Sequence, residues 1–91
     1  MTDHQIYNNK NFKINFGINK ADGMILIRFY YKSDVVLITE YCPRENKYFD
    51  YQFLPKKYNK KEMLEVTLTL NFLIKNLNRL LREYLNKNRS V

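Results

Sequence analysis

The C-terminal third of the chain has the pattern of one long amphipathic helix. Over residues 59–87 the apolar side chains recur at alternating spacings of three and four, which keeps them on one side of a 3.6-residue turn. Asn59 and Glu62 are spaced as in a capping box, where each side chain accepts a hydrogen bond from the other residue's backbone amide. The apolar side consists of Met63, Val66, Leu70, Leu73, Ile74, Leu77, Leu80, Leu81, Tyr84 and Leu85.

Residues 66–70 (VTLTL) also alternate as a β-strand does, and their β-branched members suit a strand. The helical spacing continues through them without interruption, so the pattern favours a helix over the strand alternative.

A second apolar stripe lies away from the main apolar side of this helix. It consists of Leu64, Leu68 and Phe72, and the same line continues as Lys75, Arg79 and Arg82. A helix that is apolar nearly all round is typically covered from two sides. We predict that Leu64, Leu68 and Phe72 form a homodimer interface. The alternatives are cover by another protein, by the N-terminal arm of the chain or by the connection over residues 54–60.

The residues before the helix predict four short strands separated by turn residues. The turn Asn19–Gly23 requires a positive φ at Gly23, and Pro43 excludes continued central pairing after the third strand. Residues 1–10 show no periodicity and predict a flexible arm. The expected strands are Phe12–Ile18, Met24–Tyr31, Val35–Tyr41 and Lys47–Leu54.

The expected fold class is therefore α+β. A four-stranded antiparallel β-meander is followed by one long C-terminal α-helix packed on one face, which gives the order ββββα in a single domain over residues 11–91. Ile25, Ile27, Phe29 and Tyr31 are expected to face the helix.

Composition favours a non-catalytic protein with an anionic partner. The 91 residues carry a formal net charge of +7, which favours nucleic acid over an acidic protein or lipid surface. His4 and Cys42, each the only residue of its type, are not placed near partners for catalysis or metal binding. We expect no enzyme activity, no cofactor, no metal and no membrane span. One cysteine and no signal-like segment indicate an intracellular location, in the cytoplasm or with the nucleic acid.

The uncovered face of the predicted sheet is the candidate nucleic-acid site. In the expected register it carries Tyr30 and Tyr48, whose rings can stack on unpaired bases, beside cations that neutralise phosphates. A solvated sheet surface decorated with tyrosine is the simpler alternative for either ring. The predicted nucleic-acid-binding residues are Lys13, Arg28, Tyr30, Arg44, Tyr48, Lys56, Lys57, Lys75, Arg79 and Arg82.

The stretch Gly23–Tyr31 contains Ile27-Arg28-Phe29-Tyr30 and resembles the second strand of the positive-cofactor-4-like transcriptional coactivators. The segment Phe53-Leu54-Pro55 is similar to the junction between strand and helix in that family. The ββββα order also resembles the PUR repeats. The resemblance implies paired subunits or repeats that bind single-stranded nucleic acid, with Arg28 and Tyr30 facing the ligand.

Together these patterns predict a homodimeric protein that binds single-stranded DNA or RNA with low sequence specificity. The alternative is a small inhibitor or adaptor, for instance viral or plasmid-encoded, that docks a partner protein through the helix.

Overall fold

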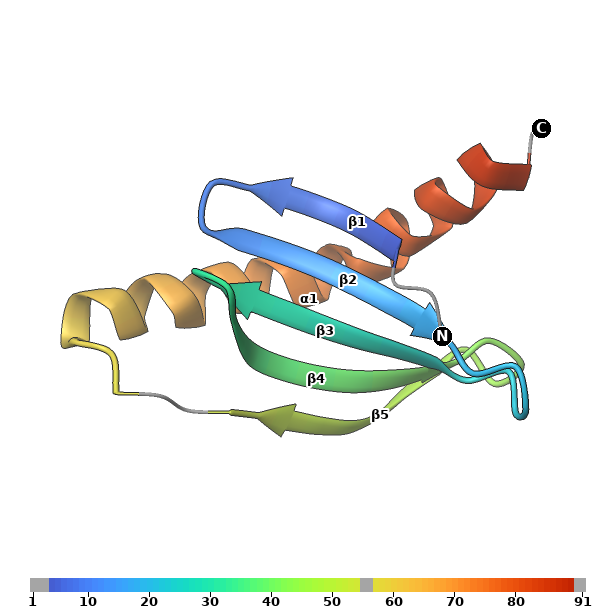
Figure 1. The fold of residues 1–91 in the computed structure, drawn as a ribbon, viewed down its shortest axis with the longest axis horizontal. Helices are drawn as coiled ribbons and strands as arrows, with labels where there is room; N and C mark the ends of the chain where they lie inside the picture. Colours follow the sequence, from blue (N-terminus) through green and yellow to red (C-terminus); the bar gives the residue numbers. More distant parts are fainter. Residues whose placement is uncertain (1–3, 55–56, 90–91) are drawn as a thin grey trace. The chain divides into compact units, whose positions relative to one another are not determined.

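The computed structural model describes residues 4–54 and 57–89. The chain divides into two units, Met1–Lys56 and Lys57–Val91. Within the described residues, the first unit is one antiparallel sheet and the second is a single helix, α1 (Lys60–Arg89) (Figure 1). The strands lie in sequence order and are β1 (His4–Asn9), β2 (Phe12–Ile18), β3 (Ile25–Tyr31), β4 (Asp34–Cys42) and β5 (Lys47–Phe53).

The sheet has five strands, so the prediction of four is wrong. The residues predicted as the middle of a flexible arm form β1, which pairs with β2 from His4 opposite Phe16 to Asn9 opposite Phe12. A bulge at Ile6 interrupts the pairing and breaks the alternation that would have identified a strand. The ring of His4 stacks on that of Phe16 at 5.1 Å between centroids, so the only histidine is part of the sheet.

The strands β2 and β3 agree with the predicted alternation. Ile14 pairs with Phe29 and Phe16 with Ile27, and all four side chains are at most 1% exposed. Residues that face each other across an antiparallel pair project from the same face. These side chains therefore define a buried face of the sheet. Gly23 has a φ of 74°, which confirms the predicted turn between β2 and β3.

A bulge in β5 changes which residues share a face. Asp50 and Tyr51 lie where β4 has only Thr39, because Gln52 pairs with Ile38 and Phe49 with Glu40. Asp50 adopts a φ of 55°, a left-handed conformation that aspartate tolerates better than most residues. The hydroxyl of buried Thr39 donates a hydrogen bond to the carbonyl of Phe49 at 2.9 Å and holds the bulge.

This bulge corrects the predicted orientation of Tyr48. Tyr48 pairs with Tyr41, which in turn pairs with buried Ile25, so Tyr48 shares the buried face rather than the face of Arg28. Phe49 is displaced to the opposite face for the same reason. The prediction for β5 assumed a regular strand. One extra residue in the bulge moves the side chains on one side of it to the opposite face of the sheet.

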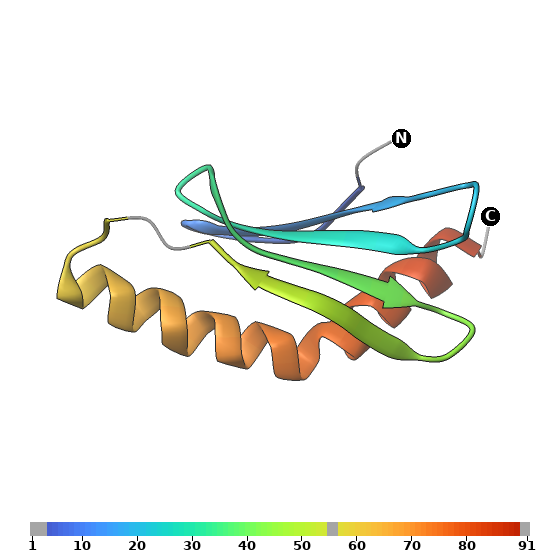
Figure 2. The ribbon, with the colours of Figure 1, turned by 90° about the horizontal axis from the view of Figure 1, so that it is seen from below.

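The helix begins at the predicted capping box. The amide of Glu62 donates to Asn59 Oδ1 at 2.7 Å and the amide of Asn59 donates to Glu62 Oε1 at 3.4 Å. One continuous helix contains residues 66–70, so the strand alternative is wrong (Figure 2). Val66, Leu70, Leu73, Leu77 and Leu81 are buried. The packing of the helix on one face of the sheet stays a prediction.

The second stripe of the helix is open to solvent. Leu64, Leu68 and Phe72 are 61%, 60% and 59% exposed, respectively. Cover by the described part of the connection, residues 54 and 57–60, is therefore not observed. Among the described residues, no helix combines the length and the apolar character needed to cross a membrane.

Candidate nucleic-acid interface

We call the face of the sheet opposite its buried face the open face. The cross-strand pairs Lys13 with Tyr30 and Asn15 with Arg28 lie on it. The pairs that continue it over β4 and β5 include Leu26 with Glu40 and Ile38 with Gln52. Gly17 and Cys42 are buried on this face, and its other members are each exposed or half-buried, so most of this face is accessible. These other members are Gln5, Asn8, Lys13, Asn15, Leu26, Arg28, Tyr30, Val35, Ile38, Glu40, Lys47, Phe49 and Gln52.

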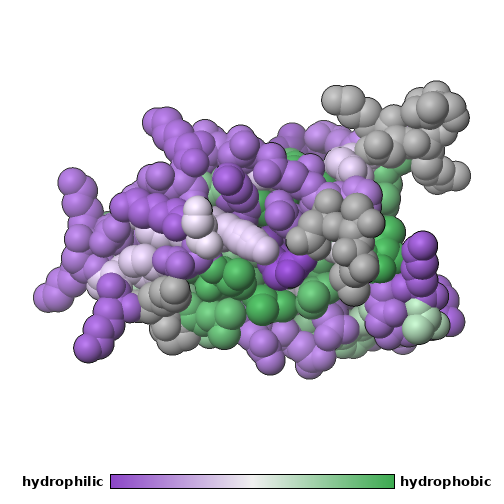
Figure 3. Space-filling view, in the orientation of Figure 1, coloured by the Kyte–Doolittle hydropathy of each residue, from purple (hydrophilic) through white to green (hydrophobic). Residues whose placement is uncertain are grey.

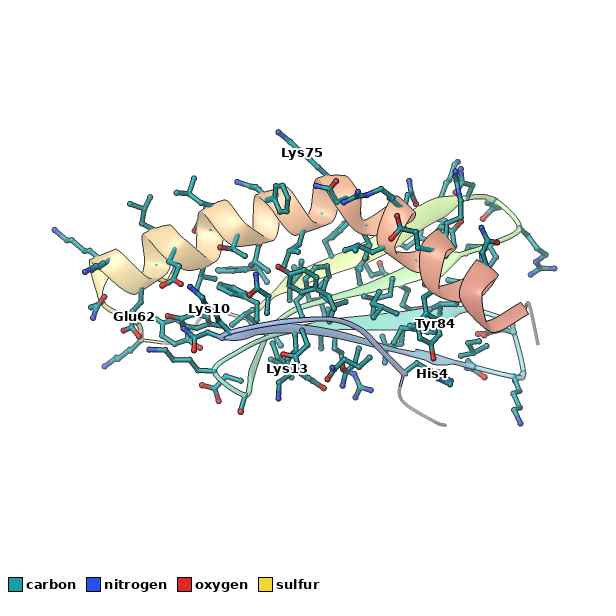
Figure 4. All side chains as sticks on the ribbon, turned by 90° about the horizontal axis from the view of Figure 1, so that it is seen from above. His4, Lys10, Lys13, Glu62, Lys75 and Tyr84 are labelled. Carbon is teal, nitrogen blue, oxygen red and sulfur yellow. The ribbon has the colours of Figure 1, made fainter. Side chains whose placement is uncertain are left out.

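Lys13 and Tyr30 form the aromatic and cationic part of the open face. They are directly opposite on β2 and β3, a position in which the Cβ atoms are about 5 Å apart. Lys13 is exposed and extends away from the sheet (Figure 4), and Tyr30 is half-buried. Arg28 lies two residues before Tyr30 and therefore projects from the same face. The ring of Tyr30, which can stack on a base, thus has one cation beside it on β2 and another beside it on β3, and both can neutralise phosphates.

Asn15 adds a hydrogen-bond acceptor beside this group. It lies opposite Arg28, and its Oδ1 is one of the buried side-chain atoms without a hydrogen-bond partner within the part of the chain that the structure describes. A buried acceptor left without a partner costs about 1–3 kcal/mol.

A pocket of about 440 Å³ lies on the β4 and β5 side of the sheet. Apolar, acidic, amide and aromatic residues line it. Hydrophobic residues gather over β3 and β4 in the surface view of the sheet (Figure 3), where Leu26 and Ile38 belong to the open face. The residues that line the pocket are Leu26, Ile38, Glu40, Asp50, Tyr51 and Gln52.

Tyr48 belongs to a separate tyrosine cluster. Its ring centroid is 4.7 Å from that of Tyr41 and 6.4 Å from that of Tyr51. Burial, followed by the neighbouring phenols of Tyr41 and Tyr51, raises the pKa of Tyr48 to about 12. The hydroxyl of Tyr41 donates to Asn46 Oδ1 at 2.7 Å, which anchors the cluster to the turn between β4 and β5. Tyr48 is thus absent from the candidate interface.

Among the described residues, the other predicted cations are exposed and belong to a turn, to the segment before the helix or to the helix itself, not to the open face of the sheet. Arg44 is in the turn between β4 and β5. Lys57 precedes the helix, and Lys75, Arg79 and Arg82 project from it, with Lys75 extending into solvent (Figure 4). Lys56 lies outside the described residues. Of the predicted binding residues, the register therefore brings together Lys13, Arg28 and Tyr30.

Sequence reasoning missed the pocket because two of its walls depend on the bulge in β5. The alternation of β3 predicts Leu26 on the open face, but nothing in the sequence places Ile38 opposite Gln52, which follows from the register of β4 with β5. Within residues 4–54 and 57–89, no three His, Cys, Asp or Glu side chains group as a metal site would require.

Comparisons of the chain with protein-family models, curated proteins and solved structures find no match.

Proposed function

We propose that this protein binds single-stranded nucleic acid, without catalysis, on the open face of the sheet. The observation that carries the proposal is the placement of Tyr30 directly opposite Lys13 and two residues from Arg28 on an accessible face. The net charge of +7 favours the same class of partner.

The chemistry of this face suits an unpaired strand better than a duplex. An unpaired base can lie flat on the ring of Tyr30, a contact worth about 1–3 kcal/mol per base. Lys13 and Arg28 then reach the phosphates on either side. A duplex buries its base faces in its own stack, so it cannot use the ring in this way. Stacking accepts every base, and the sequence preference of this contact is therefore weak.

Fluorescence anisotropy with a labelled oligo-dT tests the proposal. We expect binding at 50 mM salt that weakens at 200 mM, because bound cations release counterions from the strand. Replacing Lys13 by Gln should lower the slope of log K against log salt by about 0.7, the contribution of one phosphate contact to a single strand. Lys20→Gln is the matched control, since Lys20 is exposed in the turn between β2 and β3. Failure of the wild-type protein to bind oligo-dT at 50 mM salt would refute the proposal.

We also propose that the exposed stripe of Leu64, Leu68 and Phe72 joins two copies of the chain. The observation behind this proposal is their exposure of 59–61%, since large apolar side chains repeated along one side of a helix favour burial. Sedimentation velocity should give about 22 kDa, twice the 11.2 kDa of one chain.

A charge in the stripe should separate the two copies. Leu68→Asp should sediment as a single chain, whereas Thr67→Asp, an exposed neighbour outside the stripe, should remain a dimer. A monomeric wild-type protein would contradict the dimer. It would favour the second candidate function, an adaptor or inhibitor that docks a different protein through the same stripe.

A further inference from the structure

The pocket beside Arg28 has a chemistry that differs from the rest of the open face. The cations next to Tyr30, Lys13 and Arg28, lie on β2 and β3, whereas the acidic residues Glu40 and Asp50 are among those that line the pocket on β4 and β5. Phosphates are repelled by the carboxylate side. A strand bound on this face therefore directs its backbone towards the cations, and only an uncharged part of a nucleotide can enter the pocket.

We propose that this pocket receives one nucleobase and selects bases that carry an exocyclic amino group, guanine first, over thymine or uracil. The inference rests on the proposed function, since it assigns a specificity site to the same open face. A volume of about 440 Å³ is large enough for one base with its sugar.

The walls of the pocket suit both the flat apolar face and the polar edge of a base. Leu26 and Ile38 offer apolar contact to its flat face, because each lies on the open face of adjacent strands. Glu40 is directly opposite Leu26, and Gln52 is directly opposite Ile38. The polar groups are therefore next to the apolar ones, where the edge of a bound base would lie.

The carboxylate of Glu40, which is opposite Leu26, gives the selectivity. An ionised carboxylate only accepts hydrogen bonds. Guanine offers two neighbouring donors on its Watson–Crick edge, and cytosine and adenine each offer an amino group. Thymine offers one ring N–H between two carbonyl oxygens, which a carboxylate repels. In a single strand these edges are not occupied by pairing, so a protein can read them.

The pocket is also within reach of a strand that stacks on Tyr30. Leu26, Arg28 and Tyr30 follow one another on the open face of β3, and four residues of a strand span about 13 Å. One stretch of β3 thus carries the contacts for all three parts of the strand: Tyr30 for the stacked base, Arg28 for the phosphate and Leu26 for the selected base.

Anisotropy titrations with oligo-dT and with the same oligonucleotide carrying one central dG test the inference. One bidentate contact to a base edge discriminates by about fivefold or more, so we expect the dG oligonucleotide to bind the wild-type protein at least fivefold more tightly. Glu40→Gln should remove most of that preference and leave oligo-dT binding unchanged or stronger, because a repulsive charge is lost. Glu45→Gln is the matched control, since Glu45 is exposed in the turn between β4 and β5.

The outcomes separate this inference from the proposed function. Salt-sensitive binding of oligo-dT with no preference for dG would overturn the pocket and leave the binding face intact. A preference that survives in both Glu40→Gln and Gln52→Ala would also overturn it. Equal tightening of both oligonucleotides in Glu40→Gln, without a wild-type preference, would mean that the carboxylates only repel phosphate. Failure to bind either oligonucleotide would refute the pocket and the proposed function together.

Discussion

The hydrogen bond from Thr39 to the carbonyl of Phe49 offers a direct measure of how strongly the bulge in β5 is held. Thr39 is fully buried, and the bond of 2.9 Å joins it to the strand that carries the extra residue. Replacing Thr39 by Val keeps the shape of the side chain and removes the donor. The free energy of unfolding should fall by about 1 kcal/mol, because an unsatisfied acceptor costs about 2 kcal/mol in the middle of its usual range and the methyl group that replaces the hydroxyl returns about 0.8 kcal/mol.

Urea unfolding followed by circular dichroism gives this free energy. With a slope of about 1–3 kcal/mol/M for a small protein, the midpoint should fall by about 0.3–1 M at an unchanged slope. Each protein is measured at two concentrations, because dimerisation makes apparent stability depend on concentration. Thr67→Val on the exposed side of the helix is the matched control and should change the free energy of unfolding by at most about 0.5 kcal/mol. A Thr39→Val protein as stable as the wild type would refute the role of this hydrogen bond.

Two further perturbations test the helix cap and the tyrosine cluster. Asn59→Ala removes the acceptor for the Glu62 amide and should lower the free energy of unfolding by about 1 kcal/mol in the same assay, whereas Asn71→Ala on the exposed helix surface should not lower it. The pKa of Tyr48 is raised from 10.0 to about 12, so its neutral form contributes stability below pH 10 that is lost as the pH rises through about 12. Absorbance at the phenolate band should therefore show a late titration step in the wild type that Tyr48→Phe lacks, and a Tyr48→Phe curve that overlays the wild type would contradict the raised pKa.

Regular periodicity made most of the fold predictable. The predicted bounds of the four strands and of the helix differ from the observed ones by at most two residues, because each element repeats its apolar spacing over several turns or alternations. The capping box at Asn59 and the positive φ at Gly23 were also predictable, since each depends on residues close together in the sequence.

The two wrong predictions, a flexible arm in place of β1 and the orientation of Tyr48, concern segments whose structure depends on pairing with a neighbouring strand and not on the local sequence pattern. β1 is a polar edge strand with a bulge at Ile6, and its pairing with β2 rather than its own burial pattern defines it. The orientation of Tyr48 depends on whether β5 has one residue more than β4 at Asp50. Only the register between the two strands shows this. The candidate site was therefore predictable on β2 and β3, where the strands are regular, and not on β5.

The salt dependence of binding can decide how far the interface extends. Two cations, Lys13 and Arg28, neighbour Tyr30 on the open face, so a strand whose phosphates contact only these two should give a slope of about 1.4 and lose about sevenfold in affinity between 50 and 200 mM salt. If the three predicted helix cations also bound phosphates, five contacts would give a slope of about 3.5 and a loss of about 130-fold over the same range.

We expect the smaller slope, because the ring that stacks on a base and its two neighbouring cations all belong to the sheet. A protein in which Lys75, Arg79 and Arg82 are replaced by Gln is the discriminating variant. Its slope should equal that of the wild type, while Arg28→Gln should lower the slope by about 0.7. A wild-type slope near 3.5 that falls in the helix variant would contradict an interface confined to the sheet, since the lost contacts would then belong to the helix.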